Sequence, residues 1–167
     1  MVTDFLIRLE AAGDRKEVEA LLLAAFSTSL ELRLVRRLRE DNDVAYALVA
    51  VDAAGVVGHA LFSRLRAPTA ALALGPVAVA AKRRRQGVAA ELIGAGLERA
   101  RKEGWAAVVV VGDPSYYRRF GFSQGAVRGI SCRYAGPALM GLALAEGGLG
   151  EPRIEYASAF SLIPDSN

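Results

Sequence analysis

The chain has 167 residues, enough for one domain with a real hydrophobic core, and we expect a single domain over 1–167. Hydrophobic residues make up 53% and charged residues 23%, a composition that excludes a disordered chain. The formal net charge of +3 is modest, and basic residues concentrate at 33–39 and 82–85. This distribution suits an anionic ligand better than a long nucleic-acid track.

The single cysteine, Cys132, cannot form an intrachain disulfide and fits a reducing compartment. The N-terminus shows no charged-then-apolar leader, and no apolar run approaches the roughly 18 residues of a membrane span. One histidine and one cysteine, far apart in the chain, do not make a metal-binding spacing. These features predict a cytoplasmic protein that has neither a metal nor a membrane partner.

The first half of the chain predicts a strand, two helices and three further strands. Alternation of Phe5, Ile7 and Leu9 indicates the opening strand, and Asp14 can cap the first helix. The apolar positions that the two helices turn inward are Val18, Leu21, Leu22 and Ala25, then Leu34, Val35 and Leu38. The strand-like runs are Val44–Val51, Val56–Arg64 and Ala70–Val79, with a hairpin turn at 52–55 between the first two.

The second half begins with a helical period from Gln86 to Glu103. A continuous apolar run, Ala106–Val111, is typical of a strand buried on both faces, and Pro114 can start a short helix. Three more strands are expected at Val127–Tyr134, Ala138–Leu144 and Arg153–Ala159. The element order predicts a mixed sheet flanked by helices, an α/β (α+β mixed) fold.

Residues 75–89, GPVAVAAKRRRQGVA, combine a short strand, a basic turn and the start of the long helix. Backbone N–H groups at a helix start are unpaired and carry the positive end of the helix dipole. Gly87 lets the backbone approach a phosphate, and the run 82–85 supplies cations. The segment therefore predicts a pyrophosphate site, whereas the alternatives are a solvated basic turn or a nucleic-acid contact.

Two segments, RRQGVA at residues 84–89 and DPSYYRRFGF at residues 113–122, resemble motifs of the GNAT acetyltransferase superfamily. Residues 84–89, RRQGVA, are similar to its acetyl-CoA signature Q/R-x-x-G-x-G/A, and they follow a strand ending in the V-A-V triplet 77–79. Residues 113–122, DPSYYRRFGF, resemble the Y-x-x-x-G-F ending of a later motif, in the form found in a bacterial branch of GNAT proteins. The resemblance implies a mainly antiparallel mixed sheet with splayed central strands, flanked by helices.

The resemblance also implies a place for acetyl-CoA, as cosubstrate, in a gap between Pro76–Val79 and Val108–Val111. The N–H of Val77 would polarise the thioester carbonyl, Val79 would bind pantetheine, and the amides of 85–90 would meet the pyrophosphate. Tyr117 matches the family tyrosine that protonates the departing thiolate, while Asp113 is not given the role of the family asparagine. The cofactor-binding residues expected in this way are Val77, Ala78, Val79, Arg84, Arg85, Gln86, Gly87, Val88, Ala89, Ala90 and Tyr117.

The group that takes the proton from the acceptor amine is left open between Glu31, His59 and water. Glu31 starts the second helix, which borders the acceptor site in this family, so it can bind or deprotonate the amine. His59 stands on an apolar strand face, where a lone histidine is more often structural. Cys132 lies outside both motifs and needs no role as a nucleophile. Glu10, Glu17 and Glu19 are expected to be solvated.

We therefore expect an acetyl-CoA-dependent N-acetyltransferase that transfers an acetyl group directly to a primary amine. The alternative is a non-catalytic acyl-CoA-binding sensor, and nucleic-acid binding is a weaker hypothesis. The acceptor, a small-molecule or peptide amine, is not identified, although acceptor specificity is expected to reside in about residues 123–163. The C-terminal strands could pair across a homodimer.

Overall fold

The computed structural model describes residues 4–150 and 152–164. Its centre is a six-stranded sheet whose strands lie side by side in chain order. The strands are β1 (Leu6–Leu9), β2 (Val44–Asp52), β3 (Gly55–Arg64), β4 (Ala71–Val79), β5 (Ala107–Val111) and β6 (Leu139–Ala143). Neighbouring strands are antiparallel except β4 and β5, which are parallel. The predicted fold class is confirmed.

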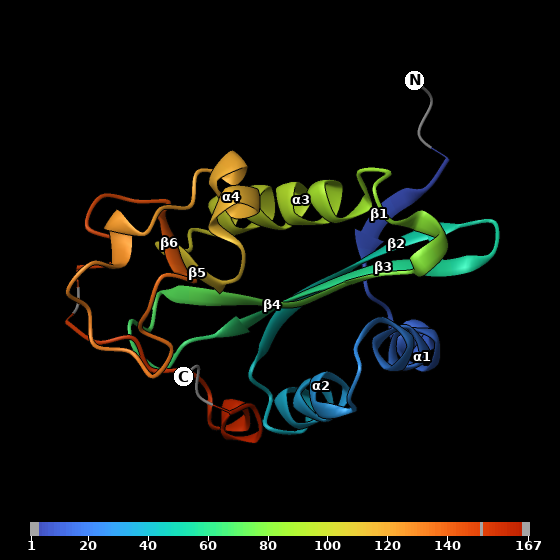
Figure 1. Cartoon of the computed structure of the whole chain (residues 1–167), viewed down its shortest axis with the longest axis horizontal. Coiled ribbons are helices and arrows are strands. Elements are labelled where there is room, and N and C mark those ends of the chain that lie inside the picture. Colours follow the sequence, from blue (N-terminus) through green and yellow to red (C-terminus); the bar gives the residue numbers. More distant parts are fainter. Residues whose placement is uncertain (1–3, 151, 165–167) are drawn as a thin grey trace.

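Helices cover both faces of the sheet (Figure 1). The α-helices are α1 (Arg15–Ala25), α2 (Leu30–Glu40), α3 (Val88–Lys102) and α4 (Pro114–Tyr117). Short 3-10 turns are η1 (Ala12–Asp14), η2 (Ala81–Arg83), η3 (Arg118–Phe120), η4 (Gly125–Val127) and η5 (Ser158–Leu162). One hydrophobic core lies between the sheet and α1, α2 and η5, and a second lies between the sheet and α3. Each core is built from the apolar stripe of its helices, as the sequence pattern predicts.

Asp14 does not cap α1 in the expected way. It occupies the N-cap position, but its carboxylate accepts hydrogen bonds from the Ala11 N–H (2.7 Å) and from the Arg8 guanidinium (2.6 and 2.9 Å). The carboxylate therefore ties η1 to β1. The hairpin turn at 52–55 is confirmed, and Asp52 closes it by accepting from the Ala54 N–H (2.7 Å).

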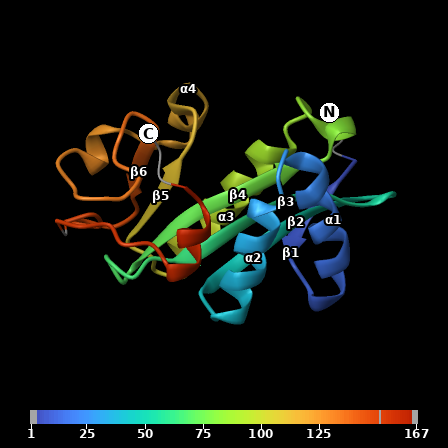
Figure 2. The same ribbon diagram turned by 60° about the horizontal axis from the view of Figure 1, so that its bottom comes forward.

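The C-terminal part contains one sheet strand, β6, where three were expected. The predicted strands at 127–134 and 153–159 are wrong, because these segments form turns with only isolated bridges, Ser131–Arg153 between the two segments and Ala67–Glu155 to the segment before β4. Gly129 has φ +79°, in the left-handed region, and this breaks an extended run. The chain then returns to the face of the sheet that α1 and α2 cover, where η5 packs beside α2 (Figure 2).

No helix within 4–150 and 152–164 is long and apolar enough to cross a membrane.

Candidate active site

The sheet opens between β4 and β5, the two parallel strands near its centre. They pair at four positions, the last of which joins Leu74 to Val110. Beyond this point β4 continues to Val79 along β3 alone. The predicted splay of the central strands is therefore present. The expected opening along Val108–Val111 is too long, since only Val111 lies beyond the paired part of β5.

A β-bulge in β4 produces the splay. Between the pairs Ala60–Val77 and Phe62–Leu74, β4 advances by three residues and β3 by two. The extra residue falls in the Gly75–Pro76 segment, and a bulge bends and twists the strand that carries it. Proline also lacks the N–H that a ladder would need at that position. The bulge therefore turns the end of β4 away from β5.

The backbone polar groups of the splayed segment alternate between β3 and the opening. The Ala80 N–H donates to the Val57 carbonyl (2.8 Å), and in an antiparallel ladder every second pair is hydrogen-bonded in this way. Ala78 therefore bonds to β3, and its side chain is buried in the core beneath α1 and α2. Val77 and Val79 direct their N–H and C=O groups into the opening, where β5 supplies no partner.

A cavity of about 370 Å³ lies at this opening, and we call it the aromatic cavity. It brings together Val77 from β4, Tyr117 from α4 and Glu31 from α2, the three groups to which the sequence assigned catalytic roles. Its complete lining is Phe26, Glu31, Leu34, Leu74, Gly75, Pro76, Val77, Val111, Tyr117, Tyr134, Tyr156, Phe160, Ile163 and Pro164. The lining combines distant parts of the chain, including the C-terminal segment.

Tyr117 and its neighbour Tyr116 face different spaces. Tyr117 is half-buried in the aromatic cavity, whereas Tyr116 lines a second cavity beside the start of α3. Gly112 makes room for the Tyr117 ring, since a Cβ on Gly112 would approach the ring carbon Cε2 to 2.5 Å. Burial, together with the neighbouring Tyr116, raises the pKa of Tyr117 to about 12. The phenol therefore remains a protonated acid at neutral pH.

Glu31 lies in the first turn of α2, where its carboxylate faces the positive end of the helix dipole. Its Oε2 atom is buried and has no hydrogen-bond partner within the described residues. A buried carboxylate oxygen without a partner is costly unless a ligand supplies one. This oxygen therefore suits a cationic or hydrogen-donating ligand in the aromatic cavity.

The second cavity, which we call the basic cavity, has a volume of about 400 Å³. It surrounds the start of α3, where Gly87 adopts φ +84° and a Cβ would meet no atom within 4 Å. The first backbone hydrogen bond of α3 runs from the Glu91 N–H to the Gly87 carbonyl (3.0 Å). The backbone N–H groups of residues 88–90 therefore have no acceptor within the helix. The lining is Val79, Arg83, Arg84, Arg85, Gly87, Val88, Ala89, Ala90, Tyr116 and Arg119.

The basic residues around this cavity divide into two groups. Arg83 is committed to structure, because its guanidinium pairs with Asp4 (2.7 Å) and Asp52 (2.7 Å). Arg84 and Arg85 line the cavity and form no ion pair with any described residue. They remain available for an anion.

Two of the residues expected to bind cofactor lie outside both cavities. The Gln86 side-chain amide donates to the Lys82 carbonyl (2.9 Å), and the Ala78 side chain is buried in the core between the sheet and α1 and α2. Conversely, sequence reasoning missed Arg119, whose guanidinium lies 4.4 Å from the centre of the Tyr116 ring and lines the basic cavity. Its position one turn after Tyr116 on the same short helical segment was the available signal.

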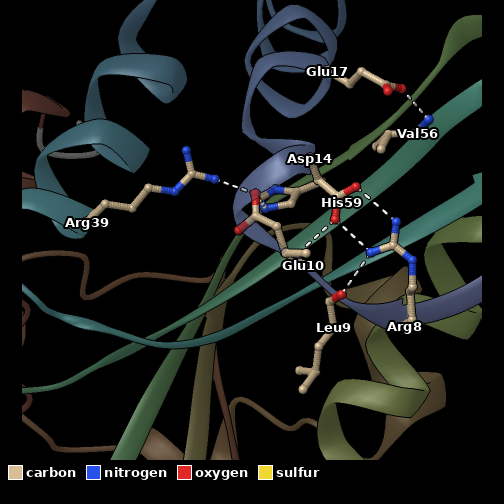
Figure 3. A network of polar contacts seen from close by, with 9 residues as sticks. Arg8, Leu9, Glu10, Asp14, Glu17, Arg39, Val56 and His59 are labelled. Carbon is tan, nitrogen blue, oxygen red and sulfur yellow. Dashed lines mark hydrogen bonds and ion pairs between the residues drawn. The ribbon is translucent and has the colours of Figure 1, made fainter.

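His59 lines neither cavity. It is completely buried in β3, with Nε2 3.6 Å from Glu10 Oε1, while Arg39 donates to the same carboxylate (Figure 3). Glu10 was expected to be solvated, but its side chain is only 11% exposed because it occupies this buried cluster. Of the candidate bases in the side chains, Glu31 alone lies in the aromatic cavity.

Cys132 is half-buried and lines neither cavity. Burial raises the pKa of its thiol, which disfavours the nucleophilic thiolate. Among the described residues, His, Cys, Asp and Glu side chains form no group of three that could hold a metal ion.

Comparison with known proteins gives the class to which this fold and site belong. Residues 15–122 match the model of the acetyltransferase (GNAT) family. A relative from Escherichia coli K12, the uncharacterised N-acetyltransferase YhbS, is 40% identical over 135 residues, which cover 78% of this chain and 81% of the relative. The chain therefore belongs to the GNAT acetyltransferase family. The predictions of this family and of an N-acetyltransferase-class enzyme are confirmed.

Solved structures agree with this assignment. The crystal structure of Escherichia coli YhbS in complex with CoA aligns with a TM-score of 0.90 and 35% identity, covering 99% of this chain and 96% of that one. A GNAT family acetyltransferase from Brucella melitensis, in complex with acetyl-CoA, aligns with a TM-score of 0.79 and 30% identity. That alignment covers 93% of this chain and 97% of the Brucella protein.

Proposed function

We propose that this protein transfers an acetyl group from acetyl-CoA directly to a primary amine. The main observation that supports this proposal is that Val77, Tyr117 and Glu31 line one cavity, at the place where β4 and β5 separate. Acetyl-CoA is the cosubstrate, in keeping with the CoA and acetyl-CoA present in the YhbS and Brucella structures.

The residues present fit this donor. The basic cavity offers the N-terminus of α3, a glycine with open space in front of it, and the cations Arg84, Arg85 and Arg119. This combination suits a pyrophosphate. The backbone groups of Val77 and Val79 that face the opening can pair with pantetheine amides, as an added strand would.

The chemistry assigns one task to each group in the aromatic cavity. The amine nitrogen attacks the thioester carbonyl, so a C–N bond forms while the C–S bond breaks. The Val77 N–H stabilises the developing oxyanion, and a donor of this kind is worth about 3–4 kcal/mol in other acyl-transfer enzymes. Tyr117 gives its proton to the leaving thiolate, and the amine proton passes to Glu31 or to water.

The test is thiol release from acetyl-CoA in the presence of a panel of primary amines, with the Tyr117→Phe variant measured alongside. We expect turnover by the wild type and a fall in kcat of about 100-fold in the variant, with little change in the KM for acetyl-CoA. Tyr46→Phe is the matched control, because the Tyr46 phenol lies outside both cavities and donates to the Gly96 carbonyl (2.6 Å). CoA binding without turnover of any amine would instead indicate the acyl-CoA sensor.

A further inference from the structure

Resting on the proposed function, we propose that the acceptor is a small primary amine with one positive charge and an apolar, aromatic body. The aromatic cavity has two properties that carry this inference. Among the residues that the structure describes, its charge is confined to a single carboxylate, and the walls away from that carboxylate are aromatic and aliphatic. The inference concerns the acceptor alone, because the pyrophosphate end of the donor is assigned to the separate basic cavity at the start of α3.

The charge pattern limits the acceptor to a monocation. Glu31 is the only Asp, Glu, Lys, Arg or His side chain among the described residues that line the cavity. Its unpartnered Oε2 can accept a hydrogen bond from an ammonium group. A second ammonium, as in a polyamine, would be buried without a counter-ion, and a carboxylate next to the amine would meet Glu31 without a cation to offset the repulsion.

The walls favour a flat apolar body. Tyr134 and Tyr156 meet edge to face, with ring centres 4.9 Å apart, and the Phe160 ring lies 4.9 Å from that of Tyr156. Tyr134 lies in the turns before β6, Tyr156 lies in the segment after β6, and Phe160 lies in η5. The η5 turn packs beside α2, which contributes Glu31 and Leu34 to the same cavity. Aromatic rings arranged in this way bind both apolar surface and organic cations.

One polar group of the wall also has no partner. Tyr156 is 8% exposed, and its hydroxyl has no hydrogen-bond partner within the described residues. An orphaned buried hydroxyl is destabilising in the free protein and is relieved by a ligand that supplies a polar atom. Tyr156 and Glu31 both line the aromatic cavity, so each residue contributes to its wall a polar group that lacks a partner among the described residues.

The first experiment compares kcat/KM for four amines of matched structure. The reference is 2-phenylethylamine. Propylamine removes the ring, phenylalanine adds a carboxylate, and spermidine replaces the ring with further ammonium groups. We expect 2-phenylethylamine to exceed each of the others by about tenfold or more. A kcat/KM for propylamine, phenylalanine or spermidine that equals or exceeds that for 2-phenylethylamine would overturn the inference while leaving the proposed N-acetyltransferase function intact.

A binding measurement separates failure of the inference from failure of the function. Calorimetry on the protein with CoA bound compares 2-phenylethylamine with its uncharged analogue, 2-phenylethanol. We expect the amine to bind about tenfold more tightly, and Glu31→Gln to abolish that preference while the Kd for CoA is unchanged. Binding of the amine without turnover would contradict the acetyltransferase function alone. Absence of amine binding, or an unchanged preference in Glu31→Gln, would overturn the inference.

Discussion

The ring of Tyr117 packs against the α-carbon of Gly112, at the point where the chain leaves β5. A side chain on Gly112 would have to displace the phenol that we assign as the acid. We expect Gly112→Ala to lower kcat by about 10–100-fold, because small misplacements of a catalytic group have effects of this size. Steady-state kinetics, with the Kd for CoA measured in parallel, provide the check.

The control for this variant is Gly13→Ala. Gly13 is exposed in η1, and a Cβ there would meet no atom within 4 Å. We expect its kcat to equal that of the wild type. An unchanged kcat in Gly112→Ala would mean that the position of the Tyr117 ring does not matter for the reaction.

Substitutions of Gly87 and Gly104 test whether the basic cavity binds the pyrophosphate of CoA, and they separate this effect from backbone strain. They flank α3 with nearly equal left-handed φ angles, +84° and +82°, and a Cβ on either would meet no protein atom within 4 Å. Alanine should therefore cost each variant a similar amount of stability, about 1 kcal/mol. We expect only Gly87→Ala to weaken CoA binding, by about tenfold, because only that methyl enters the basic cavity.

Thermal unfolding and calorimetry with CoA measure the two effects separately. If Gly104→Ala weakened CoA binding as much as Gly87→Ala, the effect would come from distortion of α3. The assignment of pyrophosphate binding to the basic cavity would then be wrong.

Alanine substitutions of two glycines within α3 should change the stability of the protein in opposite directions. A Cβ on Gly96 would clash with the buried Phe62 ring, whereas a Cβ on Gly94 would meet no atom within 4 Å. We expect Gly96→Ala to lower the free energy of unfolding by about 1–3 kcal/mol through overpacking. Gly94→Ala should raise it by about 0.5–1 kcal/mol through helix propensity. Denaturant titration of both variants tests the packing of α3 on β3, and equal effects would contradict it.

Ionisation of Asp14 makes the free energy of unfolding depend on pH in the acid range. Hydrogen bonds from Arg8 and from the Ala11 N–H lower the pKa of its carboxyl from 3.8 to about 2. Since the folded-state pKa is below the unfolded value, the ionised group stabilises the fold above about pH 4, and this stabilisation is lost as pH falls towards about 2. We expect Asp14→Asn to lower the free energy of unfolding by about 1–2 kcal/mol at neutral pH.

The difference between Asp14→Asn and the wild type should shrink as both are titrated from neutral pH towards about pH 2. Chemical denaturation at several pH values measures it. A difference that is constant with pH would show that the charge of Asp14 contributes nothing.

Local patterns in the sequence predicted most of the elements correctly. The helix after Gly87, the buried strand before Pro114 and the hairpin at 52–55 depend on neighbours in the chain, so turn chemistry and hydrophobic periodicity identify them. The predictions of strands at 127–134 and 153–159 were wrong because the structure of these segments depends on contacts with distant parts of the chain. Their apolar residues pack in turns against the core, which alternation alone does not distinguish from a strand.

The choice between Tyr116 and Tyr117 also shows that local sequence patterns do not reveal where side chains lie in the tertiary structure. Spacing favoured Tyr117, but the sequence offered no means of seeing that the two rings line different cavities. Arg119 was missed although it belongs to the same motif, because its contribution depends on where α4 stands relative to the start of α3. Gly75 and Pro76, within a predicted strand, were an available signal for the bulge that opens the sheet.

The sequence by itself determined the family and the position of the helix start to which we assign pyrophosphate binding, because both depend on contiguous residues with fixed local geometry. Only the tertiary structure decided which atoms share a cavity. Glu31, Val77, Tyr117 and Tyr156 come from four separated segments, and their meeting depends on how the helices and the C-terminal turns pack around the splayed strands. Packing of this kind arises from long-range burial of apolar surface, which leaves no local pattern in the chain.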